Sequence, residues 1–197
     1  MQLSAGFAVA VAAAAIPTLT PHGYRMSNSS RAAQADPTPV HLEADLSQRQ
    51  LTVYDGDEQA ASYDVAIGSK KYPTPTGTYR IRKIVWNPAW VPPDRGWAKG
   101  KEAQDPGAPS NPMRAVKMYF KEPDYYIHGT NAPESIGDAA SHGCLRMEEG
   151  DAANLARYLM EHGGQPRDEN WFWRVLHFRS ETKTVYLDNP ISLTISQ

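Results

Sequence analysis

Two short stretches decide the fold and chemistry of this chain: Ser141-His142-Gly143-Cys144-Leu145-Arg146, and upstream of it Ile127-His128-Gly129-Thr130. Cys144 is the only cysteine among 197 residues, so it cannot form a disulfide within the chain. It follows a His-Gly pair and lies two residues before an arginine. This setting favours the thiolate, the form of cysteine that attacks carbonyl carbons. The stretch therefore predicts a nucleophilic cysteine.

Two histidines could take the thiol proton and return it to a leaving amine. His142 lies two residues before Cys144, so both side chains share one face if the segment is extended. His128 ends a predicted strand and could reach the thiol through the fold. Sequence spacing alone does not choose between them.

The residues around the cysteine suggest how an acyl-transfer site is completed. Gly143 suits a sharp bend, and the N–H groups of Gly143 and Cys144 could point at an oxyanion. Arg146 could hold a substrate carboxylate in a bidentate grip. Two other interpretations stay open: an inert buried cysteine with structural histidines, or a zinc site of His128, His142 and Cys144. The zinc motif is weak because the chain has no C-x-x-C or H-E-x-x-H pattern.

Composition and the N-terminus bound the class of protein. A net charge of -2 and the lack of a basic tract give no reason to expect a nucleic-acid partner. Residues 1–16 are an apolar, signal-peptide-like segment, too short to span a bilayer, which takes about 20 residues. Residues 17–38 read as a flexible linker. We expect an exported protein of the periplasm or cell wall, which touches a membrane only if the N-terminal segment stays uncleaved.

The remaining chain, residues 39–197, predicts a mainly β fold with one or two helices. Alternating or apolar runs predict strands at 40–45, 50–54, 61–67, 76–85, 115–120, 125–127, 184–187 and 192–195. An apolar stripe predicts a helix between Asp151 and Gly163, and a second helix is expected from 168 to about 178.

A long segment between the predicted strands, residues 86–114, is rich in proline and glycine and holds three tryptophans. Loops of that length inside a compact domain are usually functional or disordered. The tryptophans favour an ordered segment, which either covers the edge of the core or forms a lid or groove wall. Its place just before the predicted site favours the lid or wall.

These residues together resemble one family. Ile-His-Gly-Thr at 127–130, paired with Ser-His-Gly-Cys-Leu-Arg-Met at 141–147, resembles the active-site signature of the L,D-transpeptidase catalytic domain, the YkuD family. Thr-Pro-Thr-Gly-Thr-Tyr at 74–79 resembles that family's strand-turn-strand element, and Trp-Asn-Pro at 86–88 resembles a segment of its cell-wall members. The resemblance runs from about residue 40 to residue 195 and implies that 39–197 is this catalytic domain, a β-sandwich with packed helices.

The resemblance also implies a reaction and its residues. Cys144 would form a thioester with a donor stem peptide of peptidoglycan, releasing D-Ala, before an acceptor amine attacks it. His128 would be the general base, with its ring oriented by the Gly129 carbonyl. His142 and Ser141 would support the local hydrogen bonding, and Gly143 and Cys144 would supply oxyanion donors. We expect four substrate-binding residues: Arg146, Tyr126, Trp86 and Asn131.

The resemblance implies no cofactor and no metal, and carbapenems would acylate the same thiol. The partners would be peptidoglycan stem peptides, with a lipoprotein as another acceptor. The motif does not distinguish transfer to an amine from hydrolysis, as in an L,D-carboxypeptidase or endopeptidase. A non-catalytic wall-binding protein is a third hypothesis, against which the intact Ser-His-Gly-Cys-x-Arg motif argues.

Overall fold

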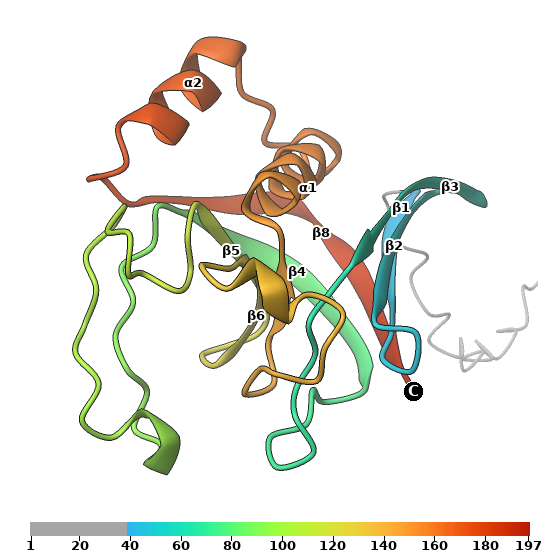
Figure 1. The fold of residues 1–197 in the computed structure, drawn as a ribbon. Helices are drawn as coiled ribbons and strands as arrows, with labels where there is room; N and C mark the ends of the chain where they lie inside the picture. Colours follow the sequence, from blue (N-terminus) through green and yellow to red (C-terminus); the bar gives the residue numbers. More distant parts are fainter. Residues whose placement is uncertain (1–38) are drawn as a thin grey trace, which may run out of the picture. The chain divides into compact units, whose positions relative to one another are not determined.

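The computed structural model describes residues 39–197 as one eight-stranded sheet with two α-helices (Figure 1). The strands are β1 (Val40–Asp45), β2 (Gln50–Asp55), β3 (Glu58–Asp64), β4 (Gly77–Trp86), β5 (Val116–Lys121), β6 (Tyr125–Gly129), β7 (Leu145–Met147) and β8 (Lys183–Ser196). The helices are α1 (Glu149–His162) and α2 (Glu169–His177), with single 3-10 turns at Gly96–Ala98 and Pro133–Ser135. The mainly β fold with packed helices is confirmed. The predicted segments 1–16 and 17–38 lie outside the described residues.

The sheet has the strand order β3-β2-β1-β8-β4-β5-β6-β7 and nearly closes on itself. β1 pairs with β8, and β6 with β7, in parallel, while the other neighbours are antiparallel. After β3 the chain crosses to the other end of the sheet, where Ala66 bridges to Arg146 and Gly68 to Ser141. The barrel-like closure therefore brings the Thr-Pro-Thr-Gly turn against the turn that carries Cys144.

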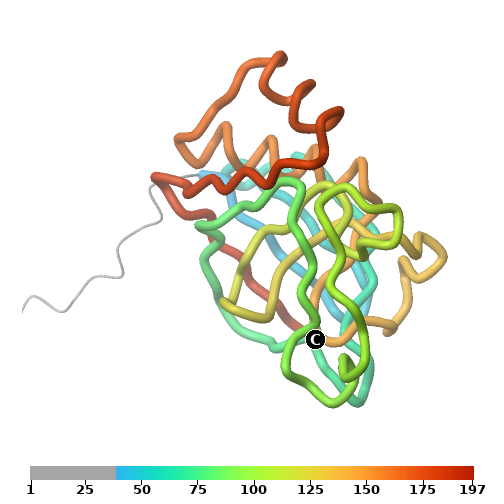
Figure 2. Tube along the Cα trace, turned by 90° about the vertical axis from the view of Figure 1, so that its left-hand side faces the viewer, coloured from blue at the N-terminus to red at the C-terminus, as the bar shows by residue number. Residues whose placement is uncertain are grey.

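Helix α1 covers the core side of β5, β6 and β8. Its buried stripe includes Leu155, Leu159 and Met160, each with no exposed surface, as the helical spacing predicts. Burying a side chain of this size contributes roughly 1.5–3 kcal/mol. Helix α1 ends at Gly163, whose backbone is packed so closely that an added Cβ would lie 2.9 Å from Leu187. Both helices lie at the same end of the domain (Figure 2).

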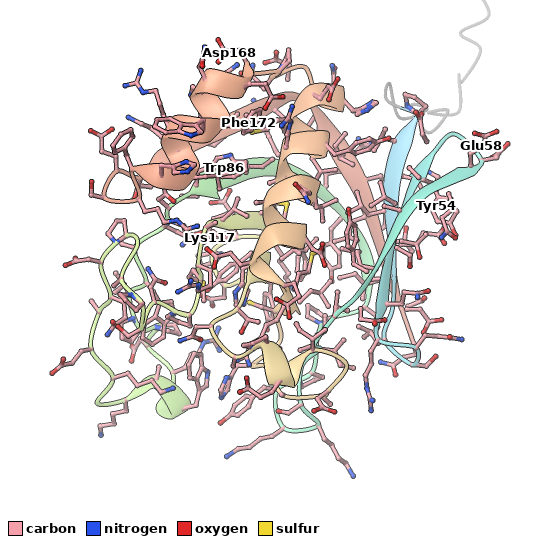
Figure 3. The ribbon with its side chains drawn as sticks, turned by 45° about the horizontal axis from the view of Figure 1, so that its top comes forward. Tyr54, Glu58, Trp86, Lys117, Asp168 and Phe172 are labelled. Carbon is pink, nitrogen blue, oxygen red and sulfur yellow. The ribbon has the colours of Figure 1, made fainter. Side chains whose placement is uncertain are left out.

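Trp86, at the end of β4, links the sheet to α2. Its ring packs edge-on against Phe172 at 5.7 Å and Trp171 at 5.9 Å, and Nε1 lies 3.2 Å from the Met160 sulfur (Figure 3). The carboxylate of Asp168 caps α2 by accepting the Trp171 N–H at 2.7 Å. Trp86 is therefore a core residue.

The C-terminal strand differs from the prediction of two short strands. β8 runs unbroken from Lys183 to Ser196, and Asn189-Pro190 lies within it. Its pairing with β4 shifts so that four residues of β8 stand opposite Arg82 alone. This bulge accommodates Pro190, which has no N–H to give to the ladder. The prediction of a break at this point was therefore wrong.

Among residues 39–197, no helix combines the length and apolar character that crossing a bilayer requires.

Candidate active site

The site is built on one face of β5, β6 and β7. Lys117 on β5 is the register partner of His128 on β6, and His128 is the partner of Arg146 on β7. Because side chains alternate along a strand, these three point to one face while their neighbours Met118, Ile127 and Leu145, all fully buried, point to the core. Tyr126 and Cys144 precede His128 and Arg146 by two residues and so share the outward face.

This face forms the floor of a cleft of about 1240 Å³. Cys144, His128, His142 and Arg146 all line it, so the structure brings together the four central residues of the prediction. The cleft extends under the segment between β4 and β5 and reaches Asn131 beyond the end of β6.

The thiol of Cys144 is held in its protonated form. Sγ donates to the backbone carbonyl of Asp124 at 3.3 Å. Burial raises the pKa of Cys144 to about 12, against the opposing effects of the Tyr126 backbone N–H and the Arg146 charge. At pH 7 the thiol therefore needs a base within the site to become a nucleophile.

His128 is the more buried of the two histidines that line the cleft. It is 3% exposed, and Nδ1 lies 2.5 Å from the carbonyl oxygen of Gly129. A carbonyl only accepts, so Nδ1 carries the proton and Nε2 keeps its lone pair. Burial, followed by the charge of Arg146, lowers the pKa of His128 to about 3, so the ring is neutral at pH 7. This contact is the one through which Gly129 is expected to orient the ring.

His142 occupies a different environment. Its ring stacks on Trp97 with centroids 3.8 Å apart and an interplanar angle of 17°, and a tilted Tyr72 ring lies 4.8 Å away. Burial, with Arg146 as the next cause, lowers the pKa of His142 as well. Within residues 39–197, neither imidazole hydrogen bonds to the thiol. The aromatic contacts make His142 part of the cleft wall beside Cys144.

The turn before the cysteine is fastened by Ser141. Its hydroxyl donates to the Cys144 carbonyl at 2.6 Å and accepts from the Gly143 N–H at 3.0 Å. Gly143 has a φ of 111°, and a Cβ there would lie 2.7 Å from the Tyr125 ring. The expectation that Gly143 donates to an oxyanion is corrected, because its N–H is already bonded to Ser141.

The four expected substrate-binding residues divide into two groups. Arg146, Tyr126 and Asn131 line the cleft, and Asn131 donates to the Ser110 carbonyl at 3.3 Å. Trp86 is 1% exposed and packs under α2, so its expected substrate contact was wrong. The sequence motif alone does not show whether its tryptophan contacts substrate or is buried in the core.

The segment between β4 and β5 forms one wall of the cleft, through Trp90 and Trp97. Trp90 pairs with Gln104 within the segment, and Arg95 forms a 2.8 Å ion pair with Asp124, the residue whose carbonyl holds the thiol proton. The groove-wall interpretation is therefore the one that fits.

Four cleft residues were not predicted from the sequence: Lys117, Tyr119, Asp124 and Tyr125. The signal for two of them was available, because Lys117 and Tyr119 alternate with the buried Met118 and Phe120. Their pairing with β6, which places them beside His128 and Tyr126, follows from the register and could not be read from local sequence.

The zinc interpretation has no geometric support. Among residues 39–197, no three His, Cys, Asp or Glu side chains come together in a way that could hold a metal ion.

The described residues form a barrel-like sheet that presents a cysteine and a histidine on one face of a cleft. The sequence model of the L,D-transpeptidase catalytic domain, YkuD, matches residues 39–175. The chain belongs to this family.

Relatives include the Bacillus licheniformis protein YkuD, 31% identical over 121 residues, which are 61% of this chain and 61% of that protein. The Escherichia coli protein YbiS is 29% identical over 125 residues, 58% of this chain and 40% of that protein. The chain thus covers less than two thirds of the length of these relatives.

Solved structures agree on the fold. An L,D-transpeptidase from Mycobacterium smegmatis has a TM-score of 0.51 at 16% identity, with 81% of this chain and 59% of that chain covered. L,D-transpeptidase 3 from Mycobacterium tuberculosis has a TM-score of 0.52 at 15% identity, covering 81% of this chain and 62% of that one.

Proposed function

We propose that this chain is a cysteine-dependent peptidoglycan L,D-transpeptidase. The observation that carries the proposal is the placement of His128 on β6 and of Cys144 directly before the adjacent strand β7, with the His128 tautomer set by the Gly129 carbonyl. That arrangement supplies a nucleophile and a base whose free nitrogen is an acceptor. Family membership supports the reaction class.

In the first half-reaction, Nε2 of His128 takes the thiol proton as Sγ of Cys144 attacks the carbonyl carbon of the third residue of a stem tetrapeptide. The tetrahedral oxyanion accepts a hydrogen bond from the backbone N–H of Cys144, since the N–H of Gly143 already donates to the Ser141 hydroxyl. The C–N bond then breaks, the proton on His128 passes to the leaving amine, and D-Ala departs from a thioester.

In the second half-reaction, His128 deprotonates an acceptor amine, which attacks the thioester carbonyl. The C–S bond breaks, and the thiolate regains its proton from the imidazolium. The Cys144 thiol and the His128 imidazole are both neutral between reactions. The thiolate–imidazolium ion pair therefore forms only while the substrate carbonyl is under attack. The hydrogen bond from the thiol to the Asp124 carbonyl breaks at the start of each cycle, when His128 takes the proton.

The surrounding residues position these groups. The Ser141 hydroxyl holds the turn by donating one hydrogen bond and accepting another. The ring of His142, stacked on Trp97, supports the turn from the side of the cleft wall. Arg146 provides a positive charge for a stem carboxylate, with Tyr126 and Asn131 on the surface along which the peptide lies.

Peptidoglycan stem peptides are the proposed donors, and a stem peptide or a lipoprotein lysine is the proposed acceptor. The substrate lies outside the cytoplasmic membrane, and the apolar segment at 1–16 is consistent with export. We therefore place the protein in the periplasm or cell wall, acting in cross-linking or remodelling.

The test is incubation of the purified chain with a tetrapeptide that contains diaminopimelate and ends in D-Ala. We expect released D-Ala and a product whose mass is that of a dimer when an acceptor stem is present. A tripeptide alone would mean hydrolysis, and the function would be that of a carboxypeptidase. Equal turnover by the Cys144→Ala variant would contradict a cysteine mechanism, and sacculus binding without any turnover would indicate a binding protein.

A further inference from the structure

The cleft carries more positive charge than the reaction requires. Five cationic side chains and two carboxylates line it, although the whole chain has a net charge of -2. One of these carboxylates, Asp124, is already paired with Arg95. The cleft is therefore suited to an anionic ligand.

Two of the cations stand out by their position on the cleft floor. Lys117 and Arg146 flank His128 in a straight row across β5, β6 and β7, each in register with it. Neither forms an ion pair with a carboxylate of residues 39–197. The ammonium of Lys117 lies over the rings of Tyr119 and Tyr126, at 5.1 Å and 5.3 Å from the centroids. These contacts orient the charge without neutralising it.

The spacing of the row indicates a ligand with two charges. Two strand separations place the backbones of Lys117 and Arg146 about 10 Å apart, with the base between them. Arg146 lies on β7, two residues after Cys144, so their backbones are at most about 7 Å apart. Lys117 lies two strands away from the thiol, at about 12 Å.

Two carboxylates of the proposed donor flank its reacting carbonyl at different distances, one nearer and one farther, as the two cations do around the thiol. The terminal D-Ala carboxylate is one residue beyond the scissile amide, so it is the nearer. The second carboxylate of diaminopimelate lies at the far end of that side chain, where four carbons separate it from the α-carbon next to the reacting carbonyl. A guanidinium and an ammonium are the side chains that pair with such groups.

We propose that Lys117 and Arg146 form a clamp for two carboxylates across His128, with Arg146 on the terminal D-Ala and Lys117 on the free carboxylate of diaminopimelate. The chain thus selects donors in which this second carboxylate is not amidated. The inference rests on the proposed function and names the specificity of the same cleft. Both cations also lower the pKa of His128, so binding of two carboxylates would offset that effect when the base is needed.

The test compares two tetrapeptides that differ only in whether the diaminopimelate carboxylate is free or amidated. We expect kcat/KM for D-Ala release to be roughly 10- to 100-fold higher for the free form, the scale of one charge-assisted hydrogen bond. Lys117→Met should remove this preference by slowing the free form alone, and Lys117→Arg should retain it. Lys121→Met is the matched control, because Lys121 is exposed on the same strand and outside the cleft lining; it should leave both rates unchanged.

A binding measurement separates this inference from the proposed function. Calorimetry on the Cys144→Ala variant, with and without Lys117→Met, measures affinity for both peptides in the absence of chemistry. A preference for the free form that depends on Lys117 supports the clamp even if the parent chain releases no D-Ala, the result that would overturn the function. Equal losses on both peptides, or no loss on either, would overturn the clamp and leave the function standing.

Discussion

Along β5, β6 and β7, side chains that build the core alternate with side chains that line the cleft. Ile127 and Leu145 are fully buried in the core, while His128 and Arg146, the next residue of each strand, face the cleft. The same backbone therefore fixes both faces, and a strand held by core packing places a functional group with little freedom. The precision of the site therefore comes from the packing of the opposite face of these strands.

The largest expected effect comes from the cleft face. Replacing the base in His128→Asn should reduce D-Ala release roughly 100- to 10,000-fold, the usual contribution of general base catalysis. His142→Asn is the matched control, since that ring packs on Trp97 and Tyr72, and we expect a loss of about tenfold or less from altered positioning. Steady-state rates of D-Ala release measure both effects. A larger loss for His142→Asn than for His128→Asn would show that His142, and not His128, is the base.

The core face should respond in stability. Ile127→Ala opens a cavity beneath His128 and should lower the free energy of unfolding by about 2–5 kcal/mol. Urea unfolding measures this change. The residual activity of the folded fraction then reports how far the core holds the base in place, and an unchanged unfolding free energy would contradict the packing described for this face.

The buried imidazole of His128 should make the free energy of unfolding depend on pH. His128 has a folded pKa of about 3, below its ordinary value of 6.5, so the unfolded chain binds a proton first as the pH falls. Stability from this group is present above pH 6.5 and is lost on acidification, by about 2 kcal/mol between pH 6.5 and pH 5. Urea unfolding at both pH values should show a smaller acid loss in His128→Asn. Equal losses in the variant and the parent would mean that His128 is not buried as a neutral ring.

The smallest effect is expected away from both faces, at α2. Asp168→Ala removes the cap on the Trp171 N–H and should cost about 1 kcal/mol of stability, with D-Ala release unchanged. Asn170→Ala, further along the same helix, is the control and should leave the melting temperature within about 1 °C, as exposed sites usually do. A loss of catalysis in Asp168→Ala would show that α2 supports the site.

Much of the fold could be predicted because alternation is a local property. β1, β2, β4, β5 and β6 lie close to where the apolar pattern placed them, and so do both helices. β7 has three residues, too few to show a period, and β8 carries its proline in a bulge whose existence depends on β4. Such features belong to the pairing of strands and are not visible in one segment.

The site was predicted where residue type is itself informative. A single cysteine and a histidine in a distinctive motif could be named, whereas Lys117 needed the register of three strands to become part of the site. The N–H of Gly143 was expected to donate to an oxyanion, but in the turn it donates to the Ser141 hydroxyl. Local bonding partners and burial therefore separate the functional residues from the structural ones.

The most direct test of the central claim is the intact mass of the chain after incubation with a carbapenem, whose strained amide reports attack by the thiol. We expect one adduct per chain, located on Cys144 by peptide mapping, absent from Cys144→Ala and formed far more slowly by His128→Asn. An adduct on another residue, or one formed equally fast without His128, would contradict the assignment of Cys144 and His128 as nucleophile and base.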